Sequence, residues 1–266
     1  MQTIKVAIIG GGNLGTAIAL GLVNKKYVDG GQITVTRRRI ELISHLSSEG
    51  IIVSNDNVAA AAASDIVMLA IKPYQIEQIV REITPVLKPG TLLVSLATGI
   101  SSTQIAAFGS LVNPIFRAMP NTAVAIGESM TCISSFQATK DQEAVVLDLF
   151  NQVGKALIIP EELMASATVL AACGIAYALR FIRAATQGGV EIGFGSELAL
   201  QIAAQTVKGA ADLIIQNGNH PEAEIDKVTT PRGITISGLN EMEHQGFSSA
   251  LIKGLLTSYN KIENGK

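Results

Sequence analysis

The feature that most constrains the fold of this chain is its opening segment, where an apolar run ends in a glycine-rich turn. Residues 5–9 read Lys-Val-Ala-Ile-Ile, and residues 10–15 follow with the pattern Gly-x-Gly-x-x-Gly. Such a run predicts a buried strand, while the small and apolar residues 16–23 predict a helix that packs against a sheet. The order of strand, turn and helix indicates a Rossmann-type unit that binds a dinucleotide.

Each glycine of this turn has a separate task in a dinucleotide site. Gly10 permits the tight turn, Gly12 lets the backbone approach a pyrophosphate, and Gly15 allows the helix to pack close to the strand. The amides at the start of the helix, around Asn13 and Leu14, would face the phosphates. The alternative is an ordinary glycine turn, and the strand and helix on either side of it favour the nucleotide site.

Further apolar runs recur through the first half of the chain, separated by helical or turn-rich pieces. They occupy residues 33–36, 66–71, 91–96 and 114–119. This alternation predicts an α/β fold with a mostly parallel sheet. Strand signals stop after residues 155–160, and the remainder reads as helices. We therefore expect a Rossmann domain at residues 1–160 followed by an all-α domain at residues 161–266.

The composition bears on possible partners. The formal net charge of −2 leaves no basic surplus for binding nucleic acid. Charged residues make up only 16% of the chain and hydrophobic ones 48%. That balance predicts that much surface is buried between subunits, so we expect a homo-oligomer of at least two chains.

Several features indicate a cytoplasmic protein without a membrane partner. The longest apolar stretch, residues 165–179, is short for a membrane span, so we expect a helix buried in protein. No basic and apolar signal segment precedes the first strand. Cys132 and Cys173 lack a metal-ligand spacing, so we expect two core thiols in a reducing compartment.

The end of the second predicted strand indicates which dinucleotide is bound. An NAD site usually offers a carboxylate to the ribose hydroxyls there, but this chain has Thr36, Arg37 and Arg38. Guanidinium groups suit a 2′-phosphate, so we expect NADPH to be preferred, with NADH possible. The alternative is a solvated basic loop before a helix.

Other candidate groups carry weaker signals. Lys72 follows the strand at residues 66–71 and is either a cofactor contact, a proton donor or a solvated strand end. His45, His220 and His244 fit no triad or metal-ligand spacing, so we expect surface or capping roles and no metal site.

A second unusual stretch, residues 227–238, is rich in hydroxyl groups around Pro and Gly and leads into an apparent helix. Its amides and hydroxyls are suited to holding a carboxylate. The alternative is a capped helix start, since Thr and Ser often cap helices. The residues alone leave both interpretations open.

Several motifs together resemble one known family. They lie at residues 10–15, 70–73, 117–122, 188–193, 203–211 and 229–238. In this combination the chain resembles the pyrroline-5-carboxylate reductases, which catalyse the last step of proline synthesis, over essentially its whole length. The resemblance implies a Rossmann domain, a helical domain for dimerisation and substrate binding, and active sites built from two subunits. It also implies reduction of 1-pyrroline-5-carboxylate to L-proline by hydride transfer from NADPH.

The resemblance also assigns residues. It places Asn57, Ala70, Lys72, Pro73, Ala97, Gly99 and Asn121 along the cofactor, with Asn121 and Thr122 near the nicotinamide. It places the substrate carboxylate at Val228, Thr229, Thr230, Pro231, Gly233, Ile234 and Thr235. The hydroxyl of Thr235 would lie near the ring nitrogen, with Lys72 as the rival proton donor.

Three positions depart from the family pattern, and two other functions compete with it. Arg232 stands where Gly is usual, Ile175 where Pro is common, and Ala123 where Pro is usual. A β-hydroxyacid dehydrogenase would need a general base, commonly Lys, and the helical domain lacks a persuasive Lys motif. The other alternative is an NADPH-binding regulator without turnover, against which the loop at residues 229–238 argues.

Overall fold

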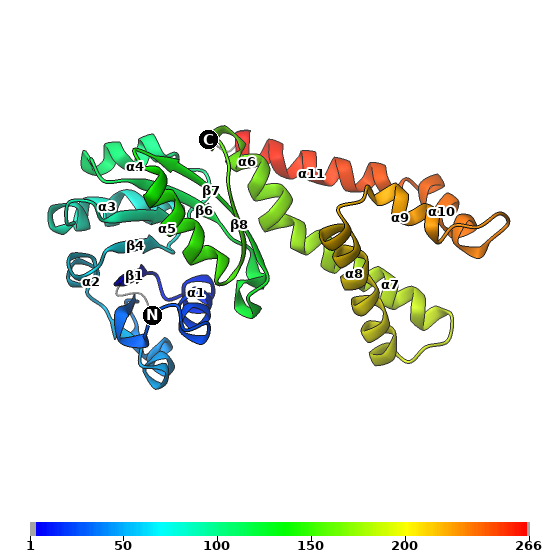
Figure 1. Cartoon of the computed structure of the whole chain (residues 1–266), viewed down its shortest axis with the longest axis horizontal. Helices are drawn as coiled ribbons and strands as arrows, with labels where there is room; N and C mark the ends of the chain where they lie inside the picture. The colour runs from blue at the N-terminus through cyan, green and yellow to red at the C-terminus, as the bar shows by residue number, and fades with distance from the viewer. Residues whose placement is uncertain (1–3, 265–266) are drawn as a thin grey trace. The chain divides into compact units, whose positions relative to one another are not determined.

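The computed structural model describes residues 4–264 and contains one sheet with helices on both faces (Figure 1). In this part of the chain the sheet has eight strands in the order β3-β2-β1-β4-β5-β6-β7-β8. The strands are β1 Val6–Ile9, β2 Ile33–Thr36, β3 Ile52–Ser54, β4 Ile66–Leu69, β5 Leu92–Ser95, β6 Ile115–Met119, β7 Ser129–Phe136 and β8 Gly154–Ile158.

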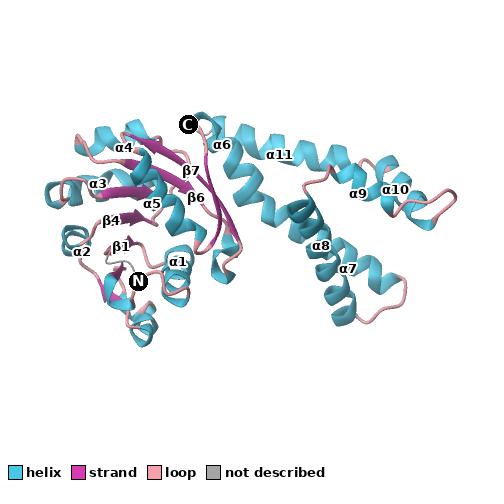
Figure 2. Ribbon diagram, in the orientation of Figure 1, coloured by secondary structure: helices cyan, strands magenta, loops and turns pink. Residues whose placement is uncertain are grey.

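Five helices accompany the sheet, and the remainder of the chain is helical (Figure 2). The helices that accompany the strands are α1 Asn13–Asn24, α2 Asn57–Ala63, α3 Ile76–Ile83, α4 Ser102–Gly109 and α5 Lys140–Asn151. The later helices are α6 Met164–Ala167, a π-helix Thr168–Cys173, α7 Gly174–Glu191, α8 Ser196–Asn217, α9 Pro221–Lys227, α10 Ile234–His244 and α11 Phe247–Asn264.

The central strands are apolar on both faces because each face of the sheet has its own core. In β1, Val6 and Ile8 pack with α1 and α5, whereas Ala7 and Ile9 pack with α2, α3 and α4. Alternate side chains of a strand point to opposite faces, so a strand covered on both sides needs an unbroken apolar run. This burial fixes the register that brings the carboxyl ends of the parallel strands to one edge.

The sheet confirms the predicted α/β architecture and adds two strands that the sequence did not reveal. Strands β1 to β6 run parallel to one another. The prediction missed β3, which has only three residues, and β7, which runs antiparallel to β6. Strand β8 then pairs in parallel with β7. The chain therefore reverses direction before it enters its helical part.

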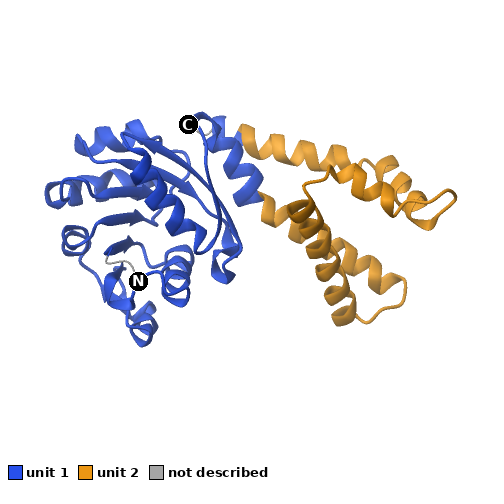
Figure 3. Cartoon of the chain, in the orientation of Figure 1, with its two compact units in different colours: residues 1–173, 261–266 blue, residues 174–260 orange. Residues whose placement is uncertain are grey.

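The chain forms two compact units, one of residues 1–173 with 261–266 and one of residues 174–260 (Figure 3). The first unit contains the whole sheet and α1 to α6. Within the second unit α7 lies beside α8. The second unit also contains α9, α10 and most of α11, and the hydroxyl of Tyr177 on α7 is 2.6 Å from the hydroxyl of Ser258 on α11.

Most of the long apolar helix is exposed in the single chain, so its expected burial in protein requires a second chain. None of the residues of α7 is buried, and Leu170, in the π-helix before it, is 72% exposed. Among the described residues, two helical runs at 161–191 and 196–217 have the length and hydropathy of a membrane span. Those criteria alone are weak evidence, and core helices of soluble proteins meet them too. The surface that covers such a helix need not lie in the same chain, which agrees with the expected homo-oligomer.

Candidate functional site

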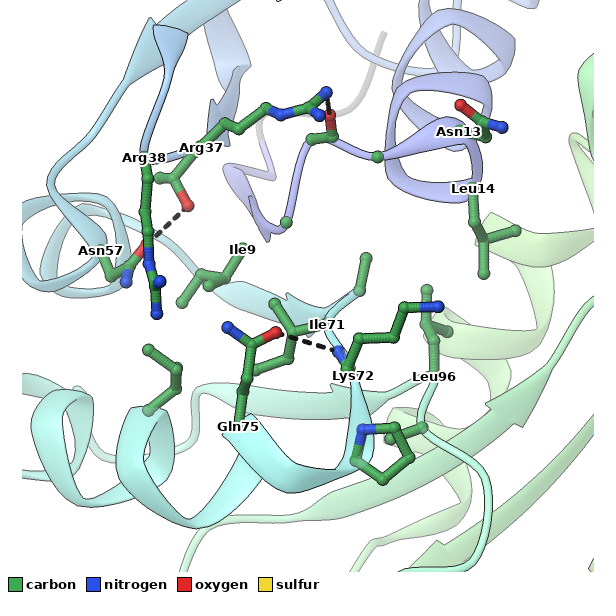
Figure 4. A pocket seen from close by; sticks show the side chains of 18 of the residues that line it. Ile9, Asn13, Leu14, Arg37, Arg38, Asn57, Ile71, Lys72, Gln75 and Leu96 are labelled. Carbon is green, nitrogen blue, oxygen red and sulfur yellow. Dashed lines mark hydrogen bonds between the residues drawn. The ribbon is translucent and has the colours of Figure 1, made fainter.

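A cavity of about 760 Å³ lies at the carboxyl ends of the parallel strands (Figure 4). Ligands of open α/β sheets gather at this edge. The cavity is lined by twelve of the predicted cofactor residues, namely Gly10, Gly12, Asn13, Leu14, Thr36, Arg37, Arg38, Asn57, Ala70, Lys72, Pro73 and Ala97. Its walls come entirely from the first unit, where strand ends, loops and the N-terminus of α1 form the cavity.

The three glycines have geometries that fit their predicted tasks. Gly10 has φ of +113°, and a Cβ there would lie 2.3 Å from the carbonyl oxygen of Ala70. A Cβ on Gly15 would lie 2.3 Å from the carbonyl oxygen of Gly10, so only glycine lets the helix approach the strand this closely. At Gly12 nothing lies within 4 Å of the Cβ position. That open space is what a pyrophosphate needs in order to reach the backbone.

The N-terminus of α1 faces the same turn. Its N-cap is Gly12, and no side chain accepts a hydrogen bond from the first-turn amides. No acidic residue lies in this first turn, so the positive end of the helix is not neutralised locally. Together, the open turn and the uncapped helix form a phosphate-binding arrangement, and these residues fit a dinucleotide.

The two arginines at the end of β2 have different surroundings. The Nη1 atom of Arg37 donates a hydrogen bond of 2.7 Å to the carbonyl oxygen of Gly11, which ties this half-buried side chain to the glycine turn. Arg38 is exposed at the rim of the cavity near Asn57 (Figure 4). Asn57 is held by the hydroxyl of Thr36, which donates a 2.6 Å hydrogen bond to its Oδ1 atom. Of these two arginines, Arg38 is therefore the more available to a ligand, and the exposed Arg39 beside it also lines the cavity.

Lys72 lies on the opposite side of the cavity and is exposed. Its backbone amide donates a 3.3 Å hydrogen bond to Oε1 of Gln75, while its side chain extends toward Leu14 (Figure 4). The cavity wall also contains residues that the sequence analysis did not select, among them Gly11, Gln75, Leu96 and Thr98. All four lie within three residues of a predicted cofactor residue. Their position beside these motifs is the sequence feature that could have identified them.

Three predicted cofactor residues lie outside the cavity wall, namely Gly15, which packs α1 against the strand, Gly99 and Asn121. Gly99 has φ of +81° in the turn that follows Thr98. Asn121 follows β6, and its Nδ2 atom donates a 3.3 Å hydrogen bond to the carbonyl oxygen of Ala171 in the π-helix. Its Oδ1 atom accepts a 3.0 Å hydrogen bond from the amide of Ala123. The assignment of Gly99 and Asn121 to the cofactor stays a prediction.

The hydroxyl-rich loop lies in the second unit, where it leads into α10. No side chain caps this helix, because its N-cap is Gly233. The hydroxyl of Thr229 instead donates a 2.8 Å hydrogen bond to the carbonyl oxygen of Ile225. The alternative of a helix start capped by Thr or Ser is therefore wrong. The uncapped first turn, which contains the exposed Thr235, suits a carboxylate.

The loop keeps a backbone conformation that usually requires glycine. Arg232 has φ of +62°, in the left-handed region that non-glycine residues seldom adopt. A glycine at this position, as the family pattern has, would adopt the same conformation at lower cost. The substitution by Arg therefore leaves the turn intact but adds some backbone strain.

Sequence reasoning missed one partly buried ion pair. Arg117 on β6 is 7% exposed, and its Nη1 atom lies 3.0 Å from Oε1 of Glu161. Burial by itself raises the pKa of Glu161, but hydrogen bonds from the Ser102 amide and from Arg117 outweigh it and hold that pKa below its ordinary value. No sequence pattern links Glu161 to Arg117, which lies 44 residues before it.

The remaining titratable candidates agree in part with expectation. His220 caps α9, where its Nδ1 atom accepts a hydrogen bond from the amide of Glu222, and His45 and His244 are exposed, as predicted. Cys132 is buried as expected, and burial raises the pKa of its thiol. The expected burial of Cys173 is wrong, because this residue is only half-buried in the π-helix.

Two family models match the chain. One is described as pyrroline-5-carboxylate reductase dimerisation and covers residues 161–264. The other, described as NADP oxidoreductase coenzyme F420-dependent, covers residues 5–99. Pyrroline-5-carboxylate reductase 1 of Dictyostelium discoideum is 45% identical over 96% of this chain, which spans about half (49%) of that relative's length. Pyrroline-5-carboxylate reductase 2 of the same organism is 43% identical, with 97% of this chain and 91% of the relative covered.

Solved structures agree with these relatives. A pyrroline-5-carboxylate reductase from Coxiella burnetii has a TM-score of 0.92 at 27% identity, with 99% of this chain and 98% of that chain covered. The Plasmodium falciparum pyrroline carboxylate reductase with NADP bound has a TM-score of 0.90 at 26% identity and the same coverage. A Mycobacterium tuberculosis 3-hydroxyisobutyrate dehydrogenase reaches only 0.53 at 16% identity, covering 70% of this chain and 67% of that one. That last likeness concerns the fold alone.

Proposed function

Because the chain belongs to the pyrroline-5-carboxylate reductase family, we propose that it reduces 1-pyrroline-5-carboxylate to L-proline with NADPH. The observation that carries this function is the cavity at the sheet edge, where an open glycine turn meets an uncapped helix N-terminus. NADPH supplies the hydride that reduces the C=N bond at C5. A protonated imine is already electrophilic, so the protein has mainly to align the reactants and exclude water.

The first unit holds the cofactor. The glycine turn and the amides of Asn13 and Leu14 contact the phosphates, and Arg38 pairs with the 2′-phosphate. Arg37 acts one step away, since its bond to Gly11 fixes the turn. This arrangement favours NADPH over NADH, because at the end of β2 the sequence has guanidinium groups rather than a carboxylate.

The second unit holds the substrate. The first-turn amides of α10 and the hydroxyl of Thr230 bind the carboxylate of the imine. No Asp, Glu or His lies between residues 228 and 238, so the hydroxyl of Thr235 positions or relays the proton for the ring nitrogen. Lys72 is the rival donor. The complete active site combines residues from two subunits.

The helical part also carries the assembly. The dimerisation model begins at residue 161, where we place the start of a dimerisation and substrate-binding domain at 161–266, after a cofactor domain at 1–160. The exposed apolar helices of this part are then covered by a second copy, so the protein is a homodimer or a larger homo-oligomer. We place the enzyme in the cytoplasm.

The decisive experiment measures NADPH oxidation by the purified protein with 1-pyrroline-5-carboxylate and identifies proline as the product. We expect turnover that depends on the imine. A dehydrogenase would instead reduce NADP with a β-hydroxyacid, and a regulator would bind NADPH without consuming it. Either of these results, without proline formation, would contradict the proposed function.

A further inference from the structure

The partly buried pair of Arg117 and Glu161 lies in a polar region inside the first unit. Arg117 stands between Ser95 on β5 and Ser134 on β7 in the sheet register, and both serines are buried. Burying a guanidinium among apolar strands is costly unless a carboxylate pairs with it. Among the described residues Glu161 is the carboxylate that forms an ion pair with Arg117.

The same carboxylate oxygen has a second partner at the start of α4. Oε1 of Glu161 accepts a 2.7 Å hydrogen bond from the amide of Ser102, the first residue of that helix. A cation close to a helix N-terminus is electrostatically unfavourable. The negative charge of Glu161 therefore compensates both Arg117 and the positive end of α4.

The ion pair lies beside both ends of a loop in the cavity wall and bonds one of them. Residues 96–98 line the cavity, and the loop of residues 96–101 runs from the end of β5 to the start of α4. At its first end Ser95 is the register neighbour of Arg117, and at its second end Ser102 is bonded to Glu161. Between these two ends lies Gly99, with φ of +81°. Because glycine has no side chain, it does little to restrain the backbone of the loop.

We propose that Glu161 is a positioning residue for the dinucleotide, because its carboxylate holds the loop of residues 96–101 in the shape that forms the cavity wall. This inference rests on the proposed cofactor site but needs no assumption about the substrate. Glu161 contacts neither ligand itself. It acts through Ser102 and Arg117, and its removal leaves a buried cation beneath a helix N-terminus.

The test is the dissociation constant of NADPH, measured by calorimetric titration of the full-length protein without imine. We expect Glu161→Ala to weaken NADPH binding about tenfold, the size of one lost charged hydrogen bond. Glu161→Gln should bind NADPH more tightly than Glu161→Ala but less tightly than the wild type, because glutamine keeps the oxygen that accepts both hydrogen bonds but loses the charge. Glu162→Ala is the matched control, since Glu162 is exposed and starts the same helix.

Wild-type affinity in a folded Glu161→Ala protein, or an equal loss in Glu162→Ala, would overturn the proposal. If Glu161→Ala does not fold, Glu161→Asp replaces it, because aspartate keeps the charge but is one methylene too short. If Glu161→Asp binds NADPH more weakly than Glu161→Gln, the positioning role is supported. The reverse order of affinities contradicts it. The NADPH affinities can be measured even if the protein fails to reduce the imine. The positioning role of Glu161 and the proposed reductase activity are therefore tested separately.

Discussion

The two units of this chain solve the problem of burying apolar surface in different ways. All residues of β1, β4, β5 and β6 are buried between the helices that cover the sheet. By contrast, α7, α10 and α11 contain no buried residue, and α8 buries only Ala199 and Ala203. The first unit completes its own core, whereas the second needs a surface from another molecule. Apolar composition alone therefore does not say where the covering surface comes from.

The largest expected effect tests this contrast directly. Leu179 on α7 is 58% exposed in the single chain, and Leu179→Asp places a charge where the second copy is expected to pack. We expect light scattering to report the mass of a single chain, with loss of activity. The control is Val112→Asp, because Val112 is 87% exposed on the first unit and should tolerate the charge. If the wild-type protein is an active monomer at assay concentration, the claim that the second unit needs a surface from another chain is wrong.

The next effect separates the chemistry of the second unit from cofactor binding by the first. Thr235→Ala should lower kcat by about tenfold to a thousandfold while the NADPH dissociation constant stays unchanged, since proton assistance typically contributes about 10² to 10⁴. Thr230→Ala should mainly raise the KM for the imine. Steady-state kinetics and NADPH titration measure these effects.

Lys72→Met provides the contrast for this experiment. If Lys72→Met abolishes turnover with NADPH affinity intact while Thr235→Ala keeps full kcat, the proton donor is Lys72. The chemistry would then reside in the first unit.

Smaller effects are expected at the two arginines of the first unit. A charged hydrogen bond contributes about 1.5 to 3 kcal/mol, and solvent reduces this value at the exposed Arg38. Arg38→Ala should raise the KM for NADPH while NADH is little affected. Arg37→Ala should weaken both cofactors equally, because Arg37 holds the glycine turn.

Parallel titrations with NADPH and NADH check this division. The double substitution should remove the preference for NADPH. A wild-type protein that uses NADH better would show that the 2′-phosphate site is misplaced.

The smallest effect concerns acid stability. Because the folded-state pKa of Glu161 lies below its unfolded value of about 4.3, its ionised form stabilises the fold above that pH. This stabilisation is lost as the pH falls through the folded-state pKa. Glu161→Gln should therefore unfold more easily than the wild type at pH 7, and the difference should shrink below about pH 4. Urea unfolding at both pH values measures it, and a constant difference would contradict the pKa direction.

How far the sequence predicts the structure also differs between the units. The strand, the glycine turn and the arginines of the cofactor cavity could be predicted because each follows from short-range geometry. The glycine at position 10, for example, is required by its φ and by the nearby Ala70 carbonyl. The short edge strand β3 gave too weak a pattern, and β7 was missed because an antiparallel strand does not follow the strand–helix alternation.

Tertiary contacts were the part that local patterns could not predict. The partners Arg117 and Glu161 lie 44 residues apart, and nothing in the sequence joins them. The exposure of Leu170 likewise depends on a surface outside the chain. At Thr229 the hydroxyl type suggested capping of the next helix, but the structure uses it to bond back to α9. These ion pairs, hydrogen bonds and exposures depend on which groups the complete fold brings close to each side chain.

The π-helix at Thr168–Cys173 has a consequence for the helix that follows it. A π turn takes about one residue more than an α turn, and each residue advances an α-helix by about 100°. The residues of α7 are therefore out of phase with those of α6, and one apolar pattern cannot be continued across both. If the same six residues were wound as an α-helix instead, all of α7 would be rotated by about 100°. The π turn absorbs this rotation, so the side of α7 that meets a second copy depends on the backbone conformation of the segment upstream of it.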